Sequence, residues 1–259
     1  MRNPLIVQFV DARLKVGRAR QHIKHLETLI QVYAGSGVHE LFMEYKPELG
    51  KYQLGFRVTK ALPPTIALYV GDAIHNLSAA LDYVASEIVG YGDKRAHFPM
   101  HETRDQLGKS VALGKVKQAA LNLEAVILDV IQPYEAGNRD LWALRKADNI
   151  NKHRLLIPSI QYSQLFGVCL QDDHGKVNVI DNLFGITGAG ILNAIRSPYP
   201  LHVTDHGQLA FSVVFGEGSY FDGSPLVQTL LKLADVVTYV IETLEAAYFG
   251  FPAKASCTG

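Results

Sequence analysis

Residues 65–90, TIALYVGDAIHNLSAALDYVASEIVG, contain the most regular pattern in the chain. Apolar residues recur there at steps of three and four, which is the spacing of one face of an α-helix. That face is formed by Ile74, Leu77, Leu81, Val84 and Ile88. Pro63 and Pro64 precede the segment and suit a helix start, because proline is tolerated in the first turn. We therefore predict a long helix that packs through this face on a hydrophobic core.

Four further segments have helical spacing. They cover about residues 8–34, 115–131, 138–155 and 225–249. Pro133 and Pro158 follow the second and third of these segments, and proline stops a helix because it has no amide proton to donate. We predict about five helices in all, with the last one packed back onto the earlier ones.

Two regions have the pattern of β-structure. Residues 39–60, HELFMEYKPELGKYQLGFRVTK, alternate apolar and polar residues on both sides of a turn at 46–50, which is typical of a β-hairpin. From 159 to 216, short apolar runs are separated by Gly, Asp and Asn, the residues that punctuate strands. We predict an N-terminal hairpin and a C-terminal antiparallel β region.

These elements define an α+β fold. It consists of a helical bundle of about five helices with an N-terminal β-hairpin and a C-terminal antiparallel β region. The chain has 259 residues and is 48% hydrophobic, which is enough apolar material for one large core. We therefore predict a single domain over 1–259, with a helical body at 1–158 and 224–250 and a β annex at 159–220.

Composition sets the expected compartment and partners. The formal net charge is zero, so the chain has no global basic field of the kind that draws proteins to nucleic-acid backbones. Its two cysteines, Cys169 and Cys257, form no CxxC pair, which favours a reduced cytoplasmic setting without a zinc ribbon. No apolar run reaches the roughly 18 residues of a membrane span. We expect a cytoplasmic protein without membrane contact.

The helix predicted over 65–90 has an unusual polar side. It gathers Asp72, His75, Asn76 and Tyr83, where a solvated face would normally have Lys and Glu. Short polar and aromatic side chains of this kind suit hydrogen bonds of fixed geometry. The side is therefore either a binding surface or a solvated face of uncommon composition.

The helix predicted over 138–155 has polar residues in the stripe that should be buried. The stripe reads Leu141, Leu144, Asp148, Asn151, Leu155. A buried carboxylate without partners costs several kcal/mol, so Asp148 must be exposed, paired or coordinating something. The simplest partner is Lys152, one turn further along the same helix.

If the two helices are neighbours, His75, Asp72, Asp148 and His153 converge on one site. A carboxylate that orients an imidazole makes a general base near neutral pH, so the candidate catalytic residues are His75, Asp148 and His153. Cations beside them would hold an anion such as phosphate. The candidate ligand-binding residues are Asp72, Asn76, Tyr83, Asn151, Lys152 and Arg154.

Two other readings of this site stay open. The residues can instead form a structural polar network in a non-enzymatic module that binds a ligand or a partner. A transition-metal site is a third reading, but the spacing of His75 and His153 matches no known metal motif, so we assign no metal and no cofactor. Two further histidines on the first predicted helix, His22 and His25, are expected to be solvated. The partner of the site would be a small anionic ligand, and the apolar terminal helix is compatible with a homodimer.

Four motifs give the chain a resemblance to a known family. They are GDAIHNLSAALDYVASEIV (71–89), HFPM (97–100), IQPY (131–134) and ADNINKHRLLIP (147–158). In this order they resemble a family of bacterial hypothetical proteins with motifs such as GDxxHNLRSALDH, FP, LQPY and NxxDKHRLL. The last motif keeps the family's Lys-His-Arg and has Asn151 in place of its Asp.

The RSALDH part of that family is similar to the Arg-x4-His signature of HEPN-type ribonucleases. These are small helical bundles that cleave RNA without a metal. The corresponding positions in this chain hold Ser78 and Tyr83. The resemblance implies a helical bundle, and it adds RNA to the partners expected for the site.

Overall fold

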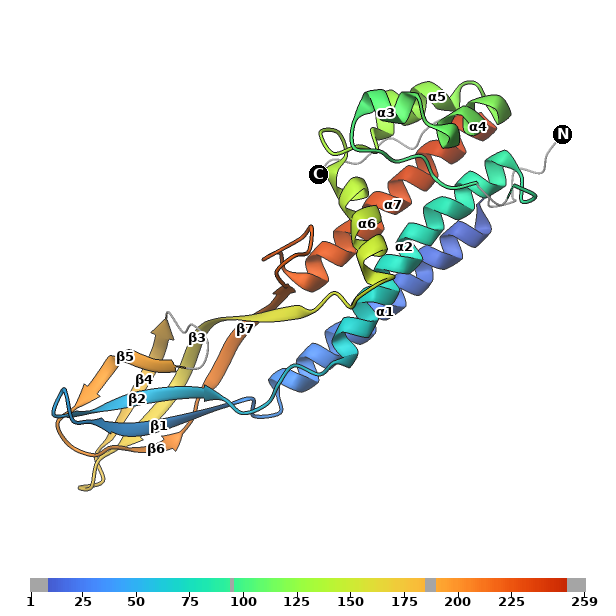
Figure 1. Cartoon of the computed structure of the whole chain (residues 1–259). Helices are drawn as coiled ribbons and strands as arrows, with labels where there is room; N and C mark the ends of the chain where they lie inside the picture. The colour runs from blue at the N-terminus through green and yellow to red at the C-terminus, as the bar shows by residue number, and fades with distance from the viewer. Residues whose placement is uncertain (1–8, 94–95, 185–189, 251–259) are drawn as a thin grey trace.

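The computed structural model describes residues 9–93, 96–184 and 190–250. The molecule is elongated, with all of its helices at one end and its strands at the other (Figure 1). We call these two parts the helical body and the β lobe. The fold is thus the mixed helix and antiparallel sheet that the sequence predicts, but its arrangement differs in several respects.

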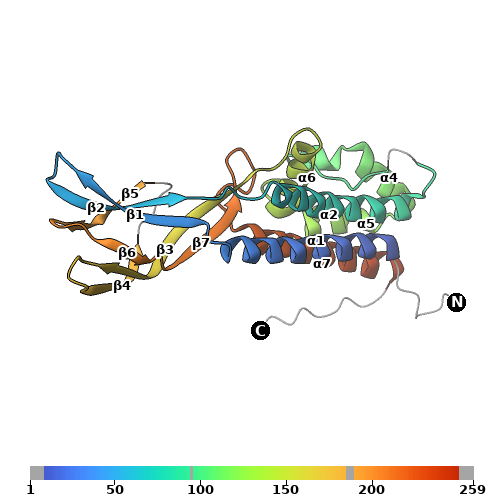
Figure 2. The ribbon, with the colours of Figure 1, turned by 90° about the horizontal axis from the view of Figure 1, so that it is seen from below.

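Four long helices form the helical body. They are α1 (Val10–Ala34), α2 (Thr65–Val89), α6 (Arg139–Asn151) and α7 (Leu226–Phe249). Ion pairs show that α1 and α7 run antiparallel, since Arg13 binds Glu245 at 2.6 Å and Arg20 binds Asp235 at 2.7 Å. Figures 1 and 2 both show α1 alongside α2. The predicted apolar face of α2 is fully buried, which confirms that this helix packs through it on the hydrophobic core.

The segment between α2 and α6 contains short helices instead of the single predicted one. They are α3 (Arg104–Gly108), α4 (Val111–Ala119), α5 (Leu123–Ala125) and a π-helix, η1 (Val126–Ile131). The predicted helix over 115–131 is broken at Ala120, whose backbone is extended (φ −154°, ψ 98°). The described residues therefore form seven α-helices rather than about five. The capping box of Thr103 and Gln106 marks the start of α3 and was the sequence signal for it.

The β lobe is made of two antiparallel sheets. The strands are β1 (His39–Lys46), β2 (Lys51–Val58), β3 (Pro158–Gln171), β4 (Val177–Phe184), β5 (Gly190–Ser197), β6 (His202–Asp205) and β7 (Gln208–Phe215). One sheet has the order β1-β2-β5, and in the other β3 pairs with β4 on one edge and with β6 and β7 on the opposite edge.

The predicted hairpin is present, but it lies in the β lobe and not in the helical body. Its inward side chains pack against those of β3 to form a second hydrophobic core, separate from the helical one. This core consists of Leu41, Leu54, Phe56, Leu165, Val168 and Leu170. The sequence alternation identifies the buried side of the hairpin, but not the sheet that covers it, because that sheet lies more than 100 residues further along the chain.

Candidate functional site

Helix α6 lies against α2 in the antiparallel direction, and one close approach and two polar contacts follow one another along the line where they meet. We call this line the α2–α6 seam. Its residue pairs are Gly71 with Asn151, His75 with Asp148, and Asp82 with Arg145. Successive α2 residues of these pairs are four and seven positions apart and therefore share one flank of the helix.

Asp148 forms the centre of the seam. Its residue is 1% exposed, and its two oxygens are both paired: Oδ1 lies 3.0 Å from Nδ1 of His75, and Oδ2 lies 2.8 Å from Nζ of Lys152. Because a carboxylate only accepts hydrogen bonds, Nδ1 of His75 carries the proton of this bond. Of the three alternatives expected for Asp148, which were exposed, paired or coordinating, the structure shows the paired one, with Lys152 and His75 as its partners.

The imidazole of His75 is fixed at Nδ1 by a hydrogen bond and is exposed to solvent on its other side. Its side chain is 54% exposed although Nδ1 is fixed by a buried carboxylate. Within the described residues, Nε2 makes no hydrogen bond. The arrangement therefore presents a ring of defined orientation and tautomer, with its second nitrogen available to a ligand.

Asn151 explains why a glycine lies inside α2. A Cβ added at Gly71 would lie 2.3 Å from Oδ1 of Asn151, so the two helices approach closely at this point. Asn151 is half-buried and is also the last residue of α6. The predicted stripe ends here, and Leu155 is 48% exposed because the helix stops before it.

Asp82 joins three segments at the other end of the seam. It receives two hydrogen bonds from the guanidinium of Arg145, at 3.0 and 2.5 Å, and one from the backbone N–H of Phe98, at 2.9 Å. Planar, two-point pairing of this kind is the strongest geometry available to an arginine and a carboxylate. The contact fixes the HFPM loop to both helices.

The other candidate residues of α2, Asp72, Asn76 and Tyr83, lie on its α1 flank and not in the seam. Nδ2 of Asn76 donates to the carbonyl of Asp72 at 2.7 Å, and Lys15 of α1 lies 3.5 Å from Oδ1 of Asn76 and 5.7 Å from the ring centre of Tyr83. Successive helical residues turn by about 100°, which divides the polar side between two neighbours. The predicted convergence of Asp72 with Asp148 is therefore not found.

His153 and Arg154 follow the end of α6 and are exposed. Neither side chain forms a hydrogen bond or an ion pair with the described residues. The structure does not join His153 to the His75–Asp148 pair, so the predicted convergence of four residues is reduced to two. Cations at this place also stabilise the C-terminal end of a helix, which is a sufficient structural reason for them.

His22 is buried, so the prediction that it is solvated is wrong. It is 7% exposed, packs against the ring of Tyr69 and has Oδ2 of Asp72 at 3.9 Å from Nδ1. Nδ1 has no hydrogen-bond partner among the described residues. Burial lowers the pKa of His22 below 6.5. The charge of Asp72 acts to raise this pKa, whereas electrostatic interactions with Arg18 and His25 act to lower it. His22 is thus a neutral core residue, and the helical spacing that assigned it to the polar side misplaced it.

Stability near neutral pH should depend on His22. Its folded pKa lies below its unfolded value of 6.5, so the unfolded chain binds the proton more strongly, and its contribution to stability is lost as pH falls below 6.5. We compare the free energy of unfolding of His22→Leu with that of the parent protein at the same pH. We expect this difference to shift in favour of the variant as the pH is lowered from about 7.5 to about 5.5. Urea unfolding at both pH values measures this. His25→Leu, which removes an exposed imidazole from the same helix, is the control, and an equal pH response of both variants would contradict the prediction.

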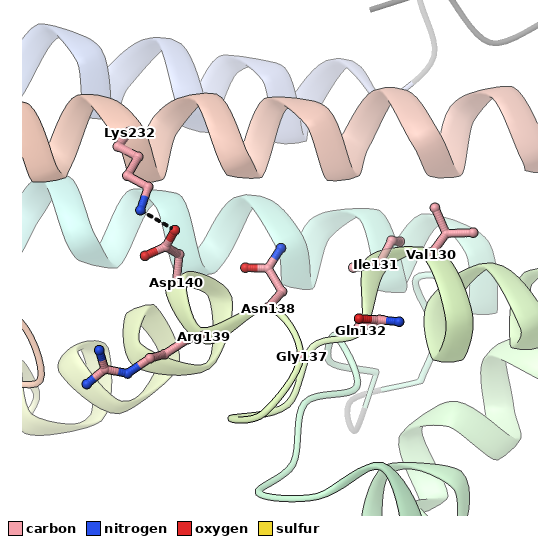
Figure 3. Close-up of a pocket in the computed structure, with 8 residues that line it drawn as sticks. All are labelled: Val130, Ile131, Gln132, Gly137, Asn138, Arg139, Asp140 and Lys232. Atoms are coloured by element: carbon pink, nitrogen blue, oxygen red, sulfur yellow. Dashed lines mark ion pairs between the residues drawn. The ribbon is translucent and has the colours of Figure 1, made fainter.

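A surface hollow of about 540 Å³ lies at the other end of α6 (Figure 3). It is bounded by the end of η1, the start of α6 and Lys232 of α7. Asp148 follows the first residue of α6 by nine positions, or roughly 14 Å of helix, so the hollow is separate from the His75 site. Sequence reasoning missed it, although the IQPY motif supplies Gln132 to its lining.

Comparison of the chain with protein-family models, curated proteins and solved structures gives no match. No helix of the described residues is long and apolar enough to cross a membrane. In the same part of the chain, no group of three or more His, Cys, Asp and Glu side chains is arranged to hold a metal ion. The geometry of the α2–α6 seam is therefore the basis for assigning a function.

Proposed function

We propose that this protein binds a small phosphate-containing anion at the exposed edge of the α2–α6 seam and hydrolyses it, with His75 as the acid–base group. The observation that carries the proposal is the half-exposed imidazole of His75 held through Nδ1 by the buried carboxylate of Asp148. A ring fixed in this way needs no reorientation before it takes a proton at Nε2.

In the proposed reaction, Nε2 of His75 removes a proton from the attacking water, whose oxygen bonds to phosphorus as the P–O bond to the alcohol breaks. The protonated ring then returns this proton to the oxygen of the leaving alcohol. Asp148 acts as a positioning residue: it holds the Nδ1–H tautomer and stabilises the positive charge that the ring acquires. The ammonium group of Lys152 has three N–H donors, of which Asp148 needs only one, and its side chain is 45% exposed. Lys152 therefore supplies the charge that holds the anion. Arg154 adds positive charge beside it, and His153 adds a further polar side chain.

The test is hydrolysis of bis(p-nitrophenyl) phosphate and p-nitrophenyl phosphate, which separates diesterase from monoesterase activity. We expect His75→Gln to lower the rate by about 100-fold or more, the usual contribution of a positioned general base. The matched control is His202→Gln, because His202 forms an exposed pair with Asp173 at 2.9 Å in the β lobe. Equal rates in both variants, or a rate no greater than that of buffer in the parent protein, would sink the proposal.

The second candidate is a non-enzymatic module in which the seam is a structural network. It is favoured by the contacts on either side of His75, since Asn151 packs closely against Gly71 and Asp82 is bound by Arg145. Under this reading His75→Gln changes the unfolding free energy but no rate, and phosphate does not raise the melting temperature. The same two variants therefore separate the candidates.

A further inference from the structure

The hollow between η1, α6 and α7 is built around a residue in an unusual backbone conformation. Gln132 has φ 55°, the left-handed region that is costly for residues other than glycine, and it directly follows the π-helix. A Cβ added at Gly137 would lie 2.6 Å from the carbonyl oxygen of Gln132, so the loop between them closes tightly. Strain of this kind concentrates at functional sites, where the surrounding structure maintains it.

Two side-chain amides in the hollow are each half satisfied. Nε2 of Gln132 donates to the carbonyl of Asp129 at 3.1 Å, and Oδ1 of Asn138 accepts from the N–H of Leu141 at 3.2 Å. These bonds fix the orientation of both amides. Within the described residues, Oε1 of Gln132 and Nδ2 of Asn138 have no partner, so the hollow offers one acceptor and one donor.

An ion pair lies beside the two amides. Nζ of Lys232 lies 2.8 Å from Oδ2 of Asp140, with side chains 64% and 30% exposed. In Figure 3, Asn138 lies between this pair and Gln132. A ligand with both an ammonium and a carboxylate group can join such a pair without leaving either charge unmatched.

We propose that this hollow binds a short zwitterionic peptide. The peptide amide pairs with Oε1 of Gln132 and Nδ2 of Asn138, while the terminal carboxylate and ammonium groups join Lys232 and Asp140. A volume of about 540 Å³ lies within the usual range of small-ligand sites and accommodates a dipeptide. The site is independent of the phosphate site proposed at His75.

The test is a titration of the isotope-labelled full chain with glycylglycine, followed through backbone amide NMR signals. We expect saturable shifts at Gln132, Asn138 and Asp140, with a dissociation constant on the order of 1 mM. Glycine has the charged ends without the amide, and N-acetylglycinamide has amides without the charges. Both should bind more weakly than glycylglycine, by about fivefold or more.

A pair of lysine variants completes the test. Lys232→Met should weaken glycylglycine binding about fivefold. Lys117→Met is the matched control, because Lys117 forms a comparable surface pair with Glu124 at 2.8 Å, away from the hollow. The absence of saturable shifts, equal binding by both variants, or glycine binding as tightly as the dipeptide would each overturn the proposal.

Discussion

Asp82→Ala should lower the free energy of unfolding by about 2–3 kcal/mol. The substitution removes three hydrogen bonds at once and leaves the guanidinium of Arg145, which is 19% exposed at its side chain, without its carboxylate. The expected cost is smaller than for a fully buried pair because the side chain of Asp82 is 34% exposed. It also frees the backbone N–H of Phe98, so the HFPM loop should detach from α2.

Urea unfolding followed by tryptophan fluorescence measures this effect. The chain has one tryptophan, Trp142, which is located on α6 one turn before Arg145 and so reports on this end of the seam. In a double-mutant cycle with Arg145→Ala, the two changes should cost less together than the sum of their separate effects.

The control is Asp129→Ala. Asp129 pairs with Arg104 at 2.5 Å, but both side chains are 57% exposed, so its loss should cost less than about 1 kcal/mol. If Asp82→Ala were equally mild, the seam would not be held together by this contact. The role of the HFPM motif as a loop fixed by Asp82 would then be wrong.

The helices were predictable from the sequence where apolar residues recur at helical spacing along the whole segment. The apolar face of α2 repeats over its whole length, and the bounds of α2 and α7 agree with the prediction to within one residue at each end. Breaks in the segment before α6 were not predictable from apolar spacing. They depend on the backbone conformations of Ala120 and Gln132, which the spacing of apolar side chains does not specify.

The centre of the site was predictable for a physical reason. Asp148 interrupts a buried stripe, and a buried carboxylate requires partners, so the sequence identifies the position before any contact is known. The choice among partners was harder, because Asp72 and His75 are only three residues apart on α2 but face different neighbours. Only the placement of α1 and α6 around α2 decides between them.

The hollow at Gln132 had no periodic signal at all. Its polar groups come from the end of one helix, the start of another and a third helix about 100 residues later, and none of them interrupts an apolar stripe. Sites formed in this way by residues of separate helices are found from the tertiary structure. A polar residue inside a core stripe, in contrast, is found from the sequence.

Asp148→Leu should separate the stability of the seam from its chemistry. Leucine is close to aspartate in length and would extend the apolar stripe of Leu141 and Leu144 on α6. Its former partners His75 and Lys152 are both about half exposed, so water can solvate them when the carboxylate is gone. We therefore expect the unfolding free energy to stay within about 1 kcal/mol of the parent protein or to rise, as when buried ionic groups are replaced by apolar ones.

Phosphate-ester hydrolysis by the same variant should fall by about 100-fold or more, because His75 loses the group that fixes its tautomer and orientation. Asp148→Asn retains an acceptor for Nδ1–H without the charge. Its rate of hydrolysis should lie between those of the parent protein and Asp148→Leu. Parallel urea unfolding and rate measurements on both variants give the answer. A leucine variant that keeps full activity removes Asp148 from the mechanism, and one that unfolds identifies the pair as structural. A stable but inactive leucine variant is the result that the proposed function requires, since a carboxylate kept in a core stripe at no gain in stability needs another reason to be there.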